Sequence, residues 1–221
     1  MCGRFTLHAD EQELIQTFQL RNEITVPRSY NIAPGQPIFA VIQQGQERRG
    51  GLLQWGLIPS WAKDRKNAYK MINARGETIA EKPSFKKAFA KRRCLLPTTG
   101  FYEWKQTADG KKPYFIRMAD EQLFAFAGLW EKWIDPESQE TVFSCTIVTT
   151  FPNELMSSLH NRMPLLLSKE GQQDWLNPEL TDVEELEKWI QPYPSEEMVA
   201  YEVSTFVNKP SNNDHSCIAP L

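Results

Sequence analysis

Hydrophobic and polar residues follow two different periods along this chain, and the first clear pattern is helical. In segment 10–20, the apolar residues Leu14, Ile15 and Phe18 would lie on one side of a helix. This spacing is typical of an amphipathic helix that buries one side. Asp10, followed three residues later by Glu13, matches a capping box. We therefore predict a helix over residues 10–20.

Further along, short apolar runs rich in β-branched and aromatic residues predict strands. These runs cover 38–43, 51–56, 94–97, 100–105, 113–118, 123–130 and 142–149, with a further extended segment over 163–167. Asp109 and Gly110 form a strong hairpin signal between two of them. The region from Pro27 to Pro37 is predicted to be a loop, because Pro34 and Gly35 interrupt it.

The remaining segments have helical character. They are a basic segment over 84–93 that Ser84 would cap, a short helix after Pro152, and two acidic segments over 168–176 and 181–190. A capping box of Thr181 and Glu184 would open the last of these. Strands cluster in the middle of the chain without alternating with helices. We therefore predict an α+β fold in a single domain, residues 1–221, with central antiparallel sheets and flanking helices.

Composition fits an ordinary globular domain, since 41% of the 221 residues are hydrophobic and 24% are charged. The net charge of −3 is unevenly spread. Residues 63–93 carry eleven Lys or Arg against three Asp or Glu, whereas residues 168–200 carry two against nine. Such asymmetry allows one basic face to attract phosphates, although a solvated helix surface explains it equally simply.

No apolar run reaches the length of a membrane span, and the first twenty residues lack a signal-peptide core. We therefore expect a cytoplasmic protein that does not enter a membrane. Its four cysteines contain no CxxC pair, so free thiols are expected and a metal site is not. Cys94 and Cys145 lie in apolar surroundings and are expected to be buried packing residues.

Cys2 is the first residue with distinctive chemistry. Removal of Met1 would expose a thiol and a free α-amine on adjacent carbons. An α-amine has a pKa near 7.7–8.0, so part of it is neutral and nucleophilic at physiological pH. The amine can condense with an aldehyde to an imine, and the thiol can then close a five-membered thiazolidine. Cys2 can equally be an incidental second residue.

Three other segments carry polar groups suited to catalysis. Asn73 and Arg75 combine an amide with a guanidinium, and Glu103 lies between aromatic residues that can raise the pKa of its carboxyl. His160 and Arg162 are two residues apart, which places both side chains on one face of an extended segment. Structural roles are also open: Asn73 can be a turn former, Glu103 a surface ion-pair partner and His160 a helix-ending residue.

Together these segments resemble the SRAP family, named for SOS-response-associated peptidases. The motifs are Met-Cys-Gly-Arg-Phe at 1–5, Tyr-Asn-Ile-Ala-Pro-Gly at 30–35, Trp-Gly-Leu-Ile-Pro-Ser-Trp at 55–61, Asn-Ala-Arg-Gly-Glu at 73–77, Gly-Phe-Tyr-Glu-Trp at 100–104 and His-Asn-Arg-Met-Pro at 160–164. The resemblance covers nearly the whole chain. It implies a barrel-like β core and a thiazolidine crosslink to abasic sites in single-stranded DNA, together with thiol autoprotease and lyase-type activity.

The resemblance also implies roles for individual residues. Cys2 would be the nucleophile, Asn73 would orient the opened sugar, Glu103 would transfer protons near the amine and favour reversal, and His160 would assist ring opening. Arg75 and Arg162 would hold phosphates, with Arg4 as a weaker candidate. Trp61 and Pro34 would contact neighbouring bases. For Trp61, core packing is an equal alternative, whereas Trp55 is expected in the core.

Two other function classes remain open at this point. The first is an N-terminal-nucleophile cysteine hydrolase that uses Cys2 with Glu103 and His160. The second is a non-covalent reader of single strands or modified bases, whose affinity would survive replacement of Cys2 and fall steeply with salt. In each case we expect a monomer that needs no metal or cofactor.

Overall fold

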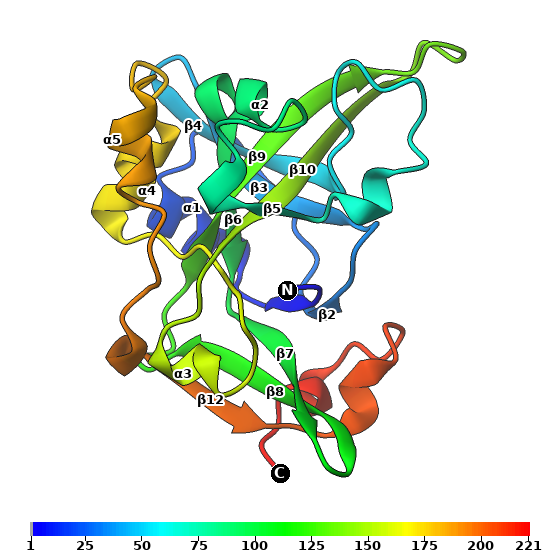
Figure 1. Cartoon of the computed structure of the whole chain (residues 1–221), viewed down its shortest axis with the longest axis vertical. Coiled ribbons are helices and arrows are strands. Elements are labelled where there is room, and N and C mark those ends of the chain that lie inside the picture. The colour runs from blue at the N-terminus through cyan, green and yellow to red at the C-terminus, as the bar shows by residue number, and fades with distance from the viewer. Residues whose placement is uncertain (1) are drawn as a thin grey trace.

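A closed five-stranded barrel forms the larger part of the fold in the computed structural model, which describes residues 2–221. Its strands are β3 (Pro37–Gln44), β4 (Glu47–Trp55), β6 (Arg93–Thr98), β9 (Phe124–Ile134) and β10 (Thr141–Thr150). The ring runs β10-β4-β3-β6-β9 and closes where β9 pairs again with β10. Figure 1 shows this barrel in the upper half of the molecule.

One pairing in the barrel departs from the antiparallel pattern predicted. β10 runs parallel to β4, with Ser144 opposite Gln54 and Cys145 opposite Trp55. It also runs parallel to the short strand β5 (Asn73–Arg75), which continues the same edge. Along this edge, β10 pairs first with β4, at Ser144 and Cys145, and then with β5, from Ile147 to Thr149. The residues of β5 therefore lie beside the end of the barrel and not within its wall.

A second, antiparallel sheet lies below the barrel (Figure 1). Its order is β12 (Met198–Glu202), β8 (Gly110–Met118), β7 (Gly100–Thr107), β1 (Phe5–Leu7) and β2 (Ser29–Ile32). The predicted hairpin is confirmed, since β7 and β8 meet at a turn in which Gly110 has a positive φ of 112° and pairs with Thr107. The predicted loop at 27–37 is partly wrong, because β2 pairs there with β1.

Aromatic packing joins the two sheets. The ring of Phe5 in β1 meets the ring of Trp55 edge-on at 5.2 Å and that of Phe126 at 5.8 Å, both from barrel strands. Aromatic pairs in this geometry stabilise a core beyond their buried area. Trp55 is 1% exposed, which confirms its predicted core position. Phe5 thereby fixes the preceding residues, including Cys2, at the junction of barrel and sheet.

Five α-helices flank the sheets within residues 2–221. They are α1 (Glu11–Phe18), α2 (Lys86–Lys91), α3 (Glu154–Ser157), α4 (Lys169–Leu176) and α5 (Val183–Glu187). Single 3-10 turns occur at Ala68–Lys70, Gly76–Thr78, Ser195–Glu197, Thr205–Asn208 and His215–Cys217, and a two-residue strand, β11 (Met163–Pro164), pairs with the end of β10. The Asp10 cap is confirmed by its bond from Glu13 N at 2.8 Å.

Two predicted helix starts are wrong. Asp182, not Thr181, caps α5, because the Asp182 carboxylate accepts the backbone N–H of Glu184. The helix therefore starts later than predicted. At α2, Phe85 holds the cap position without a side-chain bond, since the backbone already turns at Lys82 and needs no contribution from Ser84.

Several arginines of the predicted basic face form ion pairs or hydrogen bonds within the protein. Arg65 pairs with Asp135 and Glu140, and Arg92 pairs with Glu131. Arg93 is 6% exposed and donates to the carbonyl oxygens of Phe89, Ala90, Trp175, Asn177 and Leu180. Cations at helix C-termini satisfy carbonyls that the helix leaves unpaired. These arginines therefore stabilise the fold.

Within residues 2–221, no helix combines the length and apolar character needed to cross a bilayer. Cys94 and Cys145 are fully buried free thiols, as predicted.

Candidate functional site

Cys2 and Asn73 meet at the junction between barrel and sheet. The side-chain Nδ2 of Asn73 donates to the backbone oxygen of Cys2 at 2.9 Å. β1 and β7 hold Cys2 from one side, because Tyr102 N donates to the neighbouring Arg4 oxygen. On the other side of Cys2, the strand β5, which pairs with β10, supplies Asn73. Two motifs separated by about seventy residues in sequence thus converge on one backbone group.

The surroundings of Cys2 keep its thiol protonated. Cys2 is fully buried. Burial raises the pKa of the thiol, and the nearby Glu103 carboxylate raises it further. The sulfur has one weak contact, to the oxygen of Arg4 at 4.0 Å. A neutral thiol close to a carboxylate can add to a carbon electrophile if the proton has an acceptor nearby.

Glu103 lies in β7 and is 3% exposed. Burial raises the pKa of this carboxyl, while the charge of His160 acts in the opposite direction. The predicted rise in the pKa of Glu103 is therefore confirmed, and burial is its cause. A carboxyl with a raised pKa holds a proton at higher pH than an ordinary glutamate, so it can serve as a general acid and then as a base.

His160 follows α3 and has a defined orientation. Its Nδ1 accepts the backbone N–H of Arg162 at 3.1 Å. In the neutral ring the other nitrogen, Nε2, then carries the proton and acts as the donor. His160 acts electrostatically on Glu103, and Glu103 in turn acts on the Cys2 thiol, so the imidazole is linked to Cys2 through the carboxyl.

Arg162 is buried in an ion pair. It is 9% exposed, and its two terminal nitrogens bond to both carboxylate oxygens of Glu77 at 2.7 and 2.9 Å. One of these nitrogens also donates to the backbone oxygen of Thr149 at 2.8 Å. Binding a phosphate at Arg162 would have to compete with these bonds. Arg75, by contrast, is exposed at the end of β5.

Arg4 is likewise engaged within the protein. Its NH1 donates to Asn31 Oδ1 at 2.7 Å and to Val207 O at 2.9 Å, and the guanidinium lies 5.7 Å from the centre of the Trp104 ring. These contacts join β1 to β2 and to the C-terminal segment. They fit a structural role for Arg4 beside its predicted weaker role in phosphate binding.

Pro34 and Trp61 lie on surface loops. Pro34 is exposed, and Trp61 is 66% exposed, so the core alternative for Trp61 is wrong. Beside Trp61 is a pocket of about 340 Å³ with apolar walls from Leu57 and Met71 and basic and acidic groups at its edge. Such a surface suits a flat ligand.

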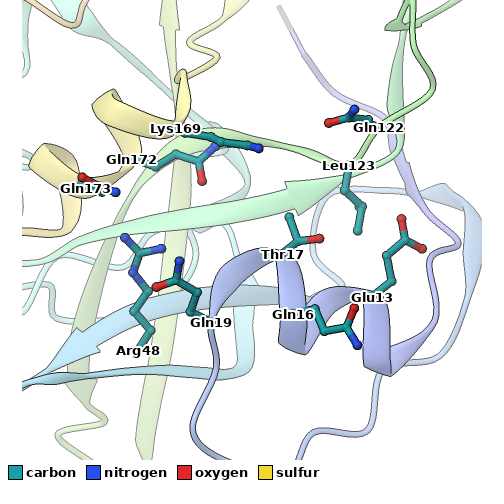
Figure 2. Close-up of a pocket in the computed structure, with 10 residues that line it drawn as sticks. All are labelled: Glu13, Gln16, Thr17, Gln19, Arg48, Gln122, Leu123, Lys169, Gln172 and Gln173. Atoms are coloured by element: carbon teal, nitrogen blue, oxygen red, sulfur yellow. The ribbon is translucent and has the colours of Figure 1, made fainter.

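A larger polar groove lies elsewhere. It has a volume of about 410 Å³ between α1 and α4, and none of the predicted site residues lines it. Figure 2 shows its ten side chains, of which five are glutamines and two are the cations Arg48 and Lys169. In the part of the chain that the structure describes, no three His, Cys, Asp or Glu residues are grouped as metal ligands.

Sequence reasoning missed several residues that shape the site. Glu77 lies within a motif used for the resemblance, but its pairing with Arg162 needs the fold. Thr149 packs against the same guanidinium, and Asn31 holds Arg4 in place. Phe151 lies 5.2 Å from Arg162 and is 59% exposed. Only the isolated apolar character of Phe151, next to Pro152 and Asn153, could have drawn attention to it.

Fold and site together define an α+β barrel protein with a buried cysteine at position 2 beside an amide and a carboxyl, and with an imidazole that acts on this carboxyl. The family model described as "SOS response associated peptidase (SRAP)" matches residues 1–210. The chain therefore belongs to the SRAP family.

Proteins similar to this chain come from bacteria and vertebrates. It is 49% identical to the abasic site processing protein YoqW of Bacillus subtilis (strain 168), over 99% of each chain. It is 34% identical to the abasic site processing protein HMCES of Gallus gallus, over 76% of this chain and 56% of that one. A crystal structure of a protein from Bacteroides thetaiotaomicron matches with a TM-score of 0.91 at 28% identity, covering 100% of both chains. The predicted family and fold class are confirmed.

Proposed function

We propose that this protein processes abasic sites in single-stranded DNA and becomes covalently attached to them through Cys2 once Met1 is removed. The observation that carries the proposal is that Asn73 bonds to the Cys2 backbone while the buried Glu103 carboxyl, on which His160 acts, lies near the Cys2 thiol. The names of its relatives, abasic site processing proteins, support the substrate. Loss of Met1 itself concerns a residue outside the part of the chain that the structure describes.

The proposed reaction has three steps. The abasic sugar opens from its cyclic hemiacetal to an aldehyde. The Cys2 α-amine then adds to carbon C1′, and loss of one water gives an imine. Finally the thiol sulfur adds to the same carbon while its proton passes to the nitrogen, which closes the thiazolidine. One water is lost overall, and no oxidant or reductant is needed.

Glu103 and His160 supply the proton transfers. Ring opening needs a proton moved from the sugar hydroxyl to the ring oxygen, and imine formation needs a proton on the departing oxygen. We assign the first to His160 and the second to Glu103, whose raised pKa keeps a proton available. The same Glu103 proton can reopen the thiazolidine, so it also favours reversal. Lyase-type cleavage would branch from the imine, and ring closure competes with it.

The electrostatics of the thiol favour this reaction over hydrolysis of peptides. A cysteine peptidase needs a thiolate, which a neighbouring cation stabilises. Here burial raises the pKa of the Cys2 thiol, and Glu103 raises it further whenever its carboxyl is ionised. Addition of a neutral thiol to an imine does not need the thiolate to accumulate, because the proton is transferred to nitrogen.

The DNA would lie across the exposed residues around this cluster. Arg75 is the exposed cation nearest in sequence to Asn73, and Trp61 and Pro34 are exposed side chains suited to base contacts. We also propose that the whole of residues 1–221 is one domain, because Val203 bridges to Pro220 beyond the family match. A monomer in the reducing cytoplasm would keep the Cys2 thiol free.

The test is the intact mass of the protein after incubation with a single-stranded oligonucleotide that carries one abasic site. We expect a heat-stable adduct whose mass equals the protein without Met1 plus the oligonucleotide minus one water. Cys2→Ala should form no adduct, and Cys2→Ser should form only an imine that borohydride traps. A full adduct with Cys2→Ala would contradict the proposal, and binding without any adduct would support a non-covalent reader instead.

A further inference from the structure

Phe151 is an exposed aromatic residue at the end of β10, where the chain leaves the barrel. Its side chain is 59% exposed, although burying a phenylalanine side chain would be favourable by about 2 kcal/mol. Pro152 follows it and restricts its backbone to extended conformations. A single exposed apolar side chain is common on protein surfaces, so what makes Phe151 a candidate contact residue is its position beside Arg162 and β5.

The ring lies on the same side of the sheet as the site. β5 runs parallel to β10, with Asn73 opposite Ile147 and Arg75 opposite Thr149. Residues two apart on a strand share a face, so Ile147 and Thr149 lie on one face of β10. Phe151, directly after the strand, contacts the Arg162 guanidinium that also bonds to the Thr149 side chain, which places its ring on the Thr149 side. Four residues of extended chain place Phe151 about 13 Å beyond the level of Asn73. Counted along the strand direction from Asn73, which bonds to Cys2, Phe151 thus lies past Arg75.

Arg162 fixes one face of this ring. The guanidinium carbon lies 5.2 Å from the ring centre. Glu77 and Thr149 hold that guanidinium by several hydrogen bonds, so it cannot swing away freely. A cation against one face of an aromatic ring orients the ring. The exposed area of Phe151 then remains available to a flat partner.

We propose that Phe151 stacks on a nucleobase that flanks the abasic site on the Arg75 side, and that this stack helps to position the lesion at Cys2. The inference rests on the proposed function and adds a base-contacting residue to it. Stacking on an aromatic side chain accepts any base, because each base offers a π face. Phe151 therefore contributes affinity for a base at that position rather than for a particular sequence.

The experiment measures non-covalent affinity, so that it does not depend on crosslinking. The probe is a single strand with an unreactive tetrahydrofuran in place of the abasic sugar, bound to the full-length protein. A further set of oligonucleotides is derived from this probe, and each of them lacks one of the bases near the lesion. We expect Phe151→Leu, which still covers Arg162, to bind the complete strand at least about fivefold more weakly, and Phe151→Trp to bind it as well as the wild type. Phe143→Leu, at the exposed opposite end of β10, is the matched control and should have no effect.

The strands with missing bases separate stacking from a structural effect. For the strand that lacks the contacted base, wild type and Phe151→Leu should bind equally, because no stack remains to be lost. If Phe151→Leu lowers the affinity for every strand equally, or lowers it for none, the inference is overturned. The proposed function is not affected by that result as long as the wild type binds the strands. Absence of binding by the wild type would instead count against the proposed function.

Discussion

The side-chain amide of Asn73 bonds to the backbone of Cys2 through one end only. Its Nδ2 donates to the Cys2 oxygen at 2.9 Å, whereas no described residue donates to its buried Oδ1. A buried acceptor without a partner is costly, so it marks a place where a ligand donor fits. In the proposed reaction that donor is a hydroxyl of the opened sugar.

Replacing Asn73 should therefore slow adduct formation. We expect Asn73→Ala to lower the initial rate by about a hundredfold, because Cys2 loses the group that holds its backbone in position. Asn73→Asp should be comparably slow, since a carboxylate cannot donate to the Cys2 oxygen. Rates are measured by gel or mass spectrometry with excess protein. An Asn73→Ala variant that reacts at the wild-type rate would remove Asn73 from the site.

Salt dependence tests the predicted phosphate contact of Arg75. A phosphate contact releases counterions, so losing one should reduce the slope of log affinity against log salt by about 1. We expect this reduction for Arg75→Ala with an unreactive single strand. Arg65→Ala is the control, because Arg65 already pairs with Asp135 and Glu140. Identical slopes for wild type and Arg75→Ala would show that Arg75 binds no phosphate.

Glu103 should make stability fall as pH rises. Burial raises the pKa of Glu103 in the folded protein, so the folded state binds this proton more tightly than the unfolded state, whose glutamate titrates near 4.3. Stability is therefore lost as pH rises from the unfolded pKa towards the folded one. We expect Glu103→Gln to have a higher melting temperature than wild type at pH 7, with the difference shrinking towards pH 4. A lower melting temperature at pH 7 would indicate that the ionised form is the stabilising one.

Arg93 is expected to be essential for the fold rather than for DNA. Arg93→Met would leave five carbonyl oxygens without their donors, and we expect a loss of roughly 3–5 kcal/mol in the free energy of unfolding. Lys91→Met, an exposed cation in the same basic segment, should change stability by less than about 0.5 kcal/mol. Denaturant unfolding of both variants gives the comparison. Equal stability of the two variants would contradict the structural role of Arg93.

Much of the fold could be predicted from periodicity because its strands and helices are long enough to show it. The barrel strands each contain an apolar run, and α1 carries both a stripe and a cap. The three-residue strands β1 and β5 are too short for a readable alternation. The parallel pairing of β10 with β4 depends on barrel closure, which local patterns do not encode.

The site could be predicted only in part for a related reason. Cys2, Asn73, Glu103 and His160 stand out because their chemistry is unusual in their motifs. The availability of Arg4 and Arg162 depends on partners distant in sequence, Asn31 and Glu77, which the fold brings to them. The sequence could not decide whether Trp61 is buried, because a tryptophan in an apolar motif fits both the core and the surface.

The most direct measurement is a crystal structure of the protein after reaction with abasic single-stranded DNA. We predict that carbon C1′ of the lesion is bonded to both the sulfur and the amine nitrogen of Cys2, with no residue before it. Density that shows C1′ bonded to another side chain, or an intact lesion far from Cys2, would contradict the covalent chemistry proposed for this protein.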